Sequence, residues 1–316
     1  WRHLYRVSRD GKDIQPITAG DFDYISTVGM DMKKGLVYFI ASPDNYTQRY
    51  LYSAKLFGKG EVKRESPMDE AGQHSYSMSP TGKWAVHTFS NAVTPPVIDM
   101  EFVKAKSGDL MLDVCMIKPV NFDPNKKYPV IIEVYGEPAG STVQDVWSGG
   151  DLWNQYMVNQ GYIYVSIENR GANAPRGHEW RKCIYGEVGT FACEDQARGI
   201  QDLARQYPFI DLSRIGITGW SGGGSQTLNC MFRYPSVFHT GIAIAFVSDQ
   251  RLYDTIYQER YMNTPQNNPE GYRKGSPITY ANGLEGNLLL IHGTGDDNVH
   301  YQSCEMLVDK LVEYGK

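Results

Sequence analysis

Apolar runs and amphipathic stretches alternate along the last two thirds of the chain. Residues 130–135 form a near-continuous apolar run, as expected for a strand buried on both faces. Residues 195–206 place Ile200, Leu203 and Ala204 on one side of a helix. Further strands are predicted at residues 110–118, 161–167, 215–217, 239–246 and 288–292, and further helices at 153–159, 226–233 and 304–312. This alternation predicts an α/β fold in which a parallel sheet is covered on both faces.

The first ninety or so residues show the shorter alternation of β-strands. Residues 4–18 predict a hairpin about an Asp10-Gly11 turn. Residues 51–64 repeat this form 47 residues later, and the turn and strand at 34–39 recur at 81–86 with the same offset. A repeat of this length built from short strands is typical of propeller blades. We therefore expect about two blades of a β-propeller that continues upstream of Trp1; the alternative is an ordinary antiparallel β domain.

The pattern changes around Thr94-Pro95-Pro96, and paired prolines suit a junction between domains. The predicted organisation is a β-propeller region at residues 1–96, followed by an α/β domain at residues 97–316.

Composition adds few constraints. Hydrophobic residues make up 41% of the chain and charged residues 21%, the proportions of a globular protein with a core. The net charge of −5 gives no reason to expect nucleic acid or an anionic membrane surface as partner. The five cysteines have no metal-ligand spacing, and no apolar run reaches the roughly 18 residues that span a bilayer.

The strongest chemical signal is Gly216-Ile-Thr-Gly-Trp-Ser-Gly-Gly-Gly-Ser225. It lies between a predicted strand and a predicted helix, the context in which Gly-x-Ser-x-Gly forms a nucleophile elbow. Gly219 and Gly223 would let strand and helix approach closely around Ser221, and N–H groups at the helix start would face an oxyanion. The alternatives are a glycine-rich turn without chemistry or a phosphate-binding loop, but the Lys-Ser/Thr of a P-loop is missing.

A serine nucleophile needs a base, and the base needs a carboxylate that orients it. Gly293-Thr-Gly-Asp-Asp-Asn298 follows a predicted buried strand, where the active sites of parallel sheets lie. The spacing does not choose between Asp296 and Asp297.

The base is harder to find among the seven histidines. In α/β-hydrolases the order along the chain is serine, acid, histidine. Only His300 follows the acid, but it belongs to the acid's own loop and is interpreted as a loop or pocket-wall residue. His292 is expected to be buried at a strand end. The base is therefore expected beyond Lys316, and the chain is expected to be an inactive internal fragment.

Three linked motifs resemble the dipeptidyl peptidase IV branch of the prolyl oligopeptidase family, and bacterial members most closely. They are Gly219-Trp-Ser-Gly-Gly223, Tyr257-Gln-Glu-Arg-Tyr-Met262 and Leu289-Leu-Ile-His-Gly-Thr-Gly-Asp-Asp-Asn-Val-His300. The resemblance implies an α/β-hydrolase domain, incomplete at its C-terminus, preceded by a partial β-propeller. It also implies a serine exopeptidase that releases short N-terminal peptides, commonly after proline or alanine.

The resemblance also assigns roles to individual residues. It makes Ser221 the nucleophile and Asp296, the first of the pair, the triad acid. The oxyanion is expected to be held by the Tyr135 hydroxyl and the Gly222 backbone N–H. The remaining expected site residues bind substrate: Tyr253 and Tyr257 as aromatic walls, Val247 and Val299 as apolar walls, and Asn298 as the holder of a substrate carbonyl.

Some residues depart from the family pattern. Gly222 and Gln250 stand where the mammalian-type enzyme has tyrosine and tryptophan, which predicts a wider pocket with a looser preference for proline. The Glu-Glu pair that binds the substrate amine in this family does not occur in the chain.

The resemblance extends to partners and compartment. It implies peptide substrates, a periplasmic or secreted location and a possible homodimer, and nothing in the sequence calls for a metal or an organic cofactor. The rival interpretations are an esterase or lipase on the same fold, and a catalytically dead propeller–hydrolase protein that acts through interactions.

Overall fold

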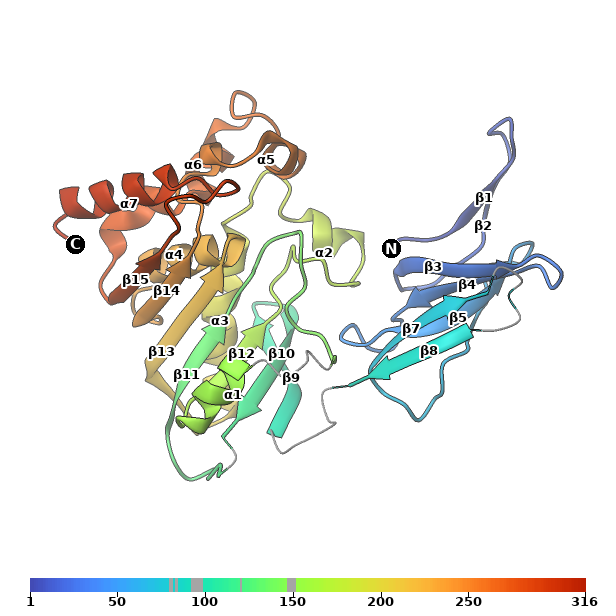
Figure 1. Cartoon of the computed structure of the whole chain (residues 1–316), viewed down its shortest axis with the longest axis horizontal. Coiled ribbons are helices and arrows are strands. Elements are labelled where there is room, and N and C mark those ends of the chain that lie inside the picture. Colours follow the sequence, from blue (N-terminus) through green and yellow to red (C-terminus); the bar gives the residue numbers. More distant parts are fainter. Residues whose placement is uncertain (80–81, 83–84, 92–98, 120, 147–151) are drawn as a thin grey trace. The chain divides into compact units, whose positions relative to one another are not determined.

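The computed structural model describes residues 1–316 apart from 80–81, 83–84, 92–98, 120 and 147–151 (Figure 1). The chain forms two compact units. The first comprises Trp1–Pro96, Gln144–Gly150 and Ala174–Trp180, and the second comprises Val97–Val143, Asp151–Asn173 and Arg181–Lys316. Because the expected junction at residues 94–96 lies outside the described residues, the division of the sequence at residue 97 stays a prediction.

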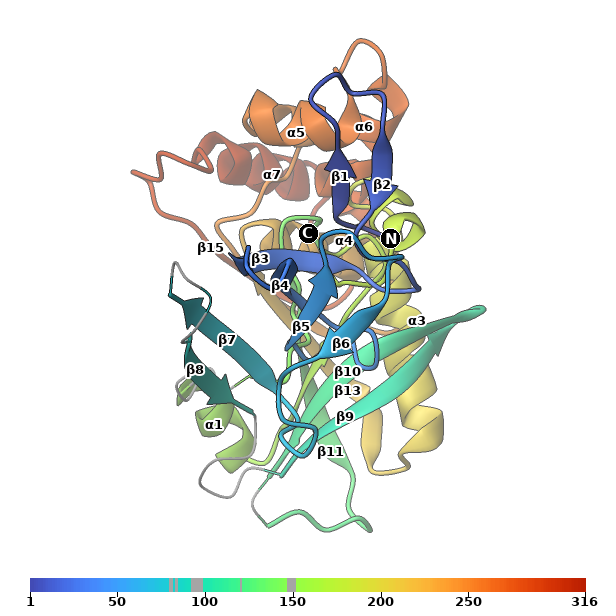
Figure 2. The ribbon, with the colours of Figure 1, turned by 90° about the vertical axis from the view of Figure 1, so that its right-hand side faces the viewer.

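The first unit is built from antiparallel strands. Its strands are β1 (Tyr5–Val7), β2 (Ile14–Pro16), β3 (Tyr24–Asp31), β4 (Leu36–Ala41), β5 (Tyr50–Lys55), β6 (Val62–Arg64), β7 (Gln73–Met78) and β8 (Ala85–Ser90). Strands β3 to β6 form a four-stranded sheet in sequence order, while β1–β2 and β7–β8 are two-stranded. The β1–β2 hairpin projects away from the four-stranded sheet (Figure 2).

The hairpin predictions for this unit are confirmed. Tyr5 pairs with Pro16 across the first hairpin, and Gly11 in its turn has a φ of 72°. Strands β5 and β6 form the second hairpin, with Tyr52 opposite Arg64. Alternate side chains of β4 and β5 lie on one face of the sheet and form a small core. In this core the ring of Phe39 stacks on that of Tyr52.

Two short segments from the middle of the sequence, Gln144–Gly150 and Ala174–Trp180, belong to the first unit. The N–H of Asp145 donates to the carbonyl of Thr47 (2.8 Å), and the N–H of Gly177 donates to the Asp23 carboxylate (3.0 Å). These bonds satisfy backbone groups far apart in sequence, which a local pattern does not reveal.

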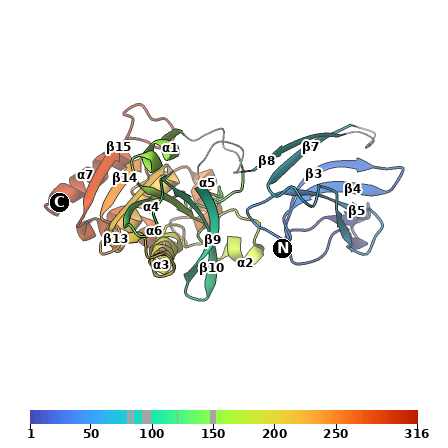
Figure 3. The ribbon, with the colours of Figure 1, turned by 90° about the horizontal axis from the view of Figure 1, so that it is seen from below.

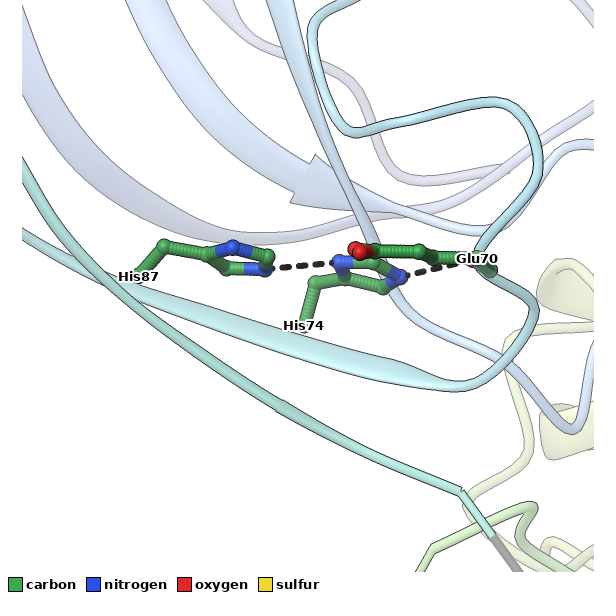
Figure 4. Close-up of side chains that lie close together, drawn as sticks. All are labelled: Glu70, His74 and His87. Atoms are coloured by element: carbon green, nitrogen blue, oxygen red, sulfur yellow. Dashed lines mark hydrogen bonds between the residues drawn. The ribbon is translucent and has the colours of Figure 1, made fainter. Parts of the chain in front are cut away.

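A histidine pair links β7 to β8 (Figure 4). His74 Nε2 lies 2.9 Å from the backbone carbonyl of Glu70, and His74 Nδ1 lies 2.9 Å from His87 Nε2. The carbonyl requires an N–H on His74 Nε2, so in the neutral ring Nδ1 accepts from His87. The side chains of Glu70, His74 and His87 offer possible ligand atoms within 4.8 Å of one another. However, two nitrogens on one tetrahedral zinc ion lie about 3.3 Å apart, so we interpret the pair as a direct hydrogen bond.

The second unit contains a seven-stranded sheet in the order β15-β14-β13-β11-β12-β10-β9 (Figure 1). The strands are β9 (Asp99–Ser107), β10 (Leu110–Lys118), β11 (Tyr128–Glu133), β12 (Ile163–Ile167), β13 (Ile210–Trp220), β14 (Thr240–Ile244) and β15 (Asn287–Ile291). The helices are α1 (Leu152–Asn159), α2 (His178–Lys182), α3 (Phe191–Gln206), α4 (Gly222–Arg233), α5 (Thr255–Met262), α6 (Pro269–Gly275) and α7 (Gln302–Glu313), with 3-10 turns at Gln250–Leu252 and Pro277–Gly283. Of these, α2 spans residues assigned to both units.

The predicted parallel sheet is confirmed for β11 to β15 but does not extend to β10 and β9. Strands β11 to β15 run parallel to one another, but β10 is antiparallel to both β9 and β12. Only Gly108 and Asp109 separate β9 from β10, and so short a turn can join antiparallel strands alone. Gly108 has a φ of 59°, which suits glycine in such a turn.

Helices cover both faces of this sheet. Helices α1 and α3 lie on opposite faces (Figure 3), and α3 and α4 contact each other as well as β13. The predicted strands and helices of this half of the chain are confirmed within a few residues at each end. Among the described residues, no helix has the length and apolar character needed to cross a bilayer.

Candidate active site

Ser221 lies at the sharp corner between β13 and α4. Its backbone has a φ of 57° and a ψ of −121°, and its N–H donates to the carbonyl of Ile244 (2.9 Å). A positive φ is costly for a residue with a Cβ, by about 1–3 kcal/mol, and such strain concentrates at functional sites. The hydrogen bond to β14 and the helix starting at Gly222 hold the serine in this conformation, which is the geometry of a nucleophile elbow.

Two glycines make this corner possible. A Cβ on Gly219 would lie 2.4 Å from the Gly223 carbonyl group, and a Cβ on Gly223 would lie 2.2 Å from the carbonyl oxygen of Val134. Both contacts involve backbone atoms, which cannot move aside without separating β11, β13 and α4. The glycines of the motif are therefore required by packing, as the sequence pattern predicts.

A pocket opens beside Ser221. Its lining comes from the loop after β11, from the elbow and from the segment after β14, and consists of Tyr135, Glu137, Ser221, Gly222, Ser225, Val247, Gln250, Tyr253, Tyr257 and Gln258. Six of the expected site residues thus surround one pocket: Ser221, Tyr135, Gly222, Val247, Tyr253 and Tyr257. These residues are as much as 122 positions apart in sequence, and the sheet brings them together.

Two tyrosines of the pocket, Tyr135 and Tyr257, have raised pKa values. Burial, followed by the nearby Glu137 carboxylate, raises the pKa of Tyr135 above its usual value. The same two causes raise the pKa of Tyr257, whose hydroxyl donates to Glu137 Oε2 (3.1 Å). A neutral phenol can donate a hydrogen bond, so Tyr135 has the protonation state that an oxyanion donor needs.

Glu137 is the pocket residue that sequence reasoning missed. It is 3% exposed, and its two carboxylate oxygens accept from Gln226 Nε2 (2.8 Å) and from the Tyr257 hydroxyl. No ion pair involves Glu137 among the described residues. Burial raises the pKa of Glu137 from 4.5 to about 7, against the opposing effect of its two hydrogen bonds. The available signal was an acidic residue two positions after Tyr135, in a loop that follows a buried strand.

The buried Glu137 carboxyl predicts a pH-dependent stability. Below about pH 4.5 the carboxyl is neutral in the folded and unfolded states. Between pH 4.5 and about 7 the carboxyl is ionised only in the unfolded state. The free energy of unfolding therefore falls by about 3 kcal/mol in total as the pH rises through this range. We expect Glu137→Gln to gain that amount relative to the wild type between pH 4 and pH 8, measured by urea unfolding. Glu285→Gln makes the same change at an exposed glutamate and is the control, and equal behaviour of the two variants would contradict the shift at Glu137.

The expected acid loop lies between β15 and α7. Asp296 Oδ1 accepts from the N–H groups of Val299 (2.9 Å) and Asn298 (3.0 Å), and these bonds, the Val299 one first, hold the pKa of Asp296 below its usual value. Asp297 is exposed. Of the two candidates that the spacing left open, Asp296 is the one that the loop backbone orients.

Two histidines stand near this loop. His292 has a fully buried side chain, as expected for a strand end; its Nε2 lies 2.7 Å from the Val299 carbonyl and 3.7 Å from Asp296 Oδ2. The carbonyl requires an N–H at Nε2, so that nitrogen is a donor here rather than a base. His300 is exposed on the same loop as Asp296.

The other expected substrate-binding residues, Asn298 and Val299, belong to the acid loop. Asn298 Oδ1 accepts from the Tyr253 hydroxyl (3.2 Å), which ties the acid loop to the pocket wall. Val299 is buried and contributes its backbone to the bonds with Asp296 and His292. The rings of Tyr253 and Tyr257 meet edge to face at 5.5 Å, as aromatic walls would.

The expected wider pocket does not come from free space beside Gly222. A Cβ on Gly222 would lie 2.2 Å from Cγ of Glu137, so the space beside this glycine is already filled. Gln250 is buried and donates to the carbonyl of Gly275 (3.2 Å), and it therefore points its amide into a polar network.

Comparison with known proteins identifies the family of the chain. Residues 149–316 match the prolyl oligopeptidase family, and residues 1–96 match the dipeptidyl peptidase IV N-terminal region. The chain belongs to the prolyl oligopeptidase family. Membership explains the two architectures of the chain, an α/β-hydrolase domain and a propeller region.

Individual relatives cover the whole chain. A "Probable dipeptidyl-aminopeptidase B" of Coccidioides posadasii is 32% identical over 98% of this chain and 37% of its own length. A "Probable dipeptidyl peptidase 4" of Emericella nidulans is 32% identical over 100% of this chain and 45% of its own length. The crystal structure of Porphyromonas gingivalis dipeptidyl peptidase 4 is 32% identical with a TM-score of 0.91, over 99% of this chain and 48% of that one.

The chain thus spans less than half the length of these relatives. They include fungal as well as bacterial proteins, so the narrower expectation of a bacterial-type member stays a prediction.

Proposed function

We propose that the protein containing this chain is a serine exopeptidase of the dipeptidyl peptidase type, which releases short peptides from N-termini after proline or alanine. The observation that carries the proposal is Ser221, held at a positive φ in an elbow whose pocket also contains Tyr135. The dipeptidyl peptidase names of the relatives support it.

The proposed reaction has two halves. The Ser221 hydroxyl attacks the carbonyl carbon of the scissile bond while a histidine takes its proton, and the new oxyanion accepts hydrogen bonds from the Gly222 N–H and the Tyr135 hydroxyl. The imidazolium protonates the departing amine, which leaves an acyl-enzyme. Water then attacks this ester with the histidine as base, and Ser221 is restored.

We propose that Asp296 orients this histidine and that the histidine lies outside residues 1–316. In support, His292 uses its Nε2 on the Val299 carbonyl, and His300 belongs to the loop of Asp296 itself. An acid and base normally reach the serine from different loops, as the order serine, acid, histidine in this fold allows.

The test of this function uses the complete gene product and dipeptide amides of a chromogenic amine. We expect hydrolysis of Ala-Pro and Ala-Ala amides with a free N-terminus and little hydrolysis of the N-acetylated forms. Cleavage of short-chain esters together with inactivity on every dipeptide amide would favour an esterase instead.

Tyr135→Phe tests the oxyanion assignment. Loss of one oxyanion donor costs about 100- to 1000-fold in kcat, and we expect a loss of that size with little change in KM, because the bond forms in the transition state. Steady-state kinetics on a dipeptide amide measure both kcat and KM. Tyr156→Phe removes a hydroxyl from an exposed tyrosine on α1 and should leave kcat unchanged. A loss below about threefold in Tyr135→Phe would remove this tyrosine from the oxyanion site.

A further inference from the structure

A side chain at Gly222, the residue after the nucleophile, would occupy the same space as the side chain of Glu137 in the loop after β11. A Cβ built on Gly222 would meet three side-chain atoms of Glu137: Cγ at 2.2 Å, Cδ at 3.1 Å and Cβ at 3.3 Å. These atoms are two carbons of the side-chain stem and the carboxyl carbon itself, so they cannot swing away without moving the carboxyl out of its place. No residue larger than glycine therefore fits at 222 while Glu137 keeps its position.

Contacts from two helices fix Glu137 in that position. Gln226 of α4 donates to Oε1 (2.8 Å), and Tyr257 of α5 donates to Oε2 (3.1 Å). The titratable groups facing the carboxyl are the hydroxyls of Tyr135 and Tyr257, both un-ionised. Glu137 thus joins the loop after β11, the helix that starts at the nucleophile and the helix that carries an aromatic wall.

The resulting pocket is small and partly polar. It offers about 30 Å³, the room of about two water molecules, so a large side chain does not fit unless Glu137 or its neighbours move. Glu137, Gln250 and Gln258 are among its lining residues, and the Gln250 and Gln258 amides bond to each other and to the Gly275 carbonyl. A hydrocarbon ring in contact with the Glu137 carboxyl gains little from that contact, because the ring offers the carboxyl no hydrogen bond.

We propose that Glu137 is a specificity-determining residue: by filling the space beside Gly222, it restricts the residue before the scissile bond to an alanine-sized, uncharged side chain in preference to proline. This inference rests on the proposed peptidase function and names the substrate class of the same site. Glu137 and Gly222 act as a pair, since a side chain at either position excludes one at the other.

The experiment compares two substrates that differ only at the residue before the scissile bond, Ala-Ala and Ala-Pro amides of the same chromogenic amine. The complete gene product is used, and the concentration of active serine is titrated with a fluorophosphonate. We expect the wild type to favour Ala-Ala at least tenfold in kcat/KM. Glu137→Gly, which empties the shared volume, should shift the ratio toward Ala-Pro by at least tenfold.

Substitutions at Gly222 test whether Glu137 and Gly222 share one space. Gly222→Ala alone should lower kcat/KM for both substrates at least tenfold, because its Cβ collides with Glu137. Glu137→Gly combined with Gly222→Ala should recover most of that loss. Glu137→Gln keeps the side-chain volume, so its Ala-Ala to Ala-Pro ratio should stay near that of the wild type whatever its overall rate.

The outcomes distinguish failure of the specificity inference from failure of the proposed peptidase function. A wild type that cleaves neither amide although Ser221 is labelled overturns the peptidase proposal, and the specificity inference with it. A wild type that cleaves Ala-Pro as fast as Ala-Ala overturns the inference alone, as does an unchanged ratio in Glu137→Gly. If Glu137→Gly does not fold, Gly222→Ala decides: full activity in that variant shows that the two positions do not share a volume.

Discussion

Ser221→Ala is expected to abolish peptide-amide hydrolysis by the complete protein, with a fall in kcat of roughly a million-fold. The reason is the position of the hydroxyl at the corner between β13 and α4, in the same pocket as the Tyr135 hydroxyl. Attack by water would remain, assisted only by the oxyanion donors and by substrate binding, which explains why a small residual rate is expected.

The control for this variant lies earlier in the chain, on β13. Ser213→Ala removes an exposed hydroxyl that bonds only locally to Asp211 (2.6 Å), and it should keep the wild-type rate. Labelling by a fluorophosphonate gives a second readout, since Ser221→Ala should lose the label and Ser213→Ala should keep it. A Ser221→Ala enzyme that retains more than about 1% of the activity would show that another group carries out the attack.

The elbow could be predicted from sequence because its chemistry and its packing depend on the same few residues. Gly219 and Gly223 must lack side chains for the backbone contacts described above, and Ser221 must stand between them. Long apolar runs at β11 and β14 likewise identify buried strands whatever their partners. Local periodicity is sufficient where burial on both faces determines the residue types.

Features that depend on contacts distant in sequence could not be predicted in this way. Glu137 reads as an ordinary loop acid until the fold places it against Gly222 and Gln226, 85 and 89 positions later. Strand β10 has an apolar run like those of parallel strands, and only the two-residue turn that joins it to β9 reveals its direction. The bonds of Asp145 and Gly177 within the first unit have no local signature at all.

The choice between Asp296 and Asp297 provides the second large expected effect. We expect Asp296→Asn to lower kcat by about ten-thousand-fold in the complete protein, because an amide would hold the catalytic imidazole in the wrong tautomer. Two backbone N–H groups hold the Asp296 carboxylate in a defined orientation and lower its pKa, so it stays ionised throughout the range in which an imidazole acts as base. The orientation and the charge are the two properties that the acid of a triad must have.

Asp297→Asn is the matched control, since it makes the same chemical change one residue later on the same loop. Asp297 is exposed, so this variant should lose less than about threefold in kcat. Steady-state kinetics on Ala-Ala amide compare the two variants, and circular dichroism checks that both are folded. The reverse order of effects would move the triad acid to Asp297, and equal small losses would exclude this loop as its source. Because the loop also carries Asn298, which accepts from Tyr253, a shift in KM without a change in kcat would instead indicate a role in substrate binding.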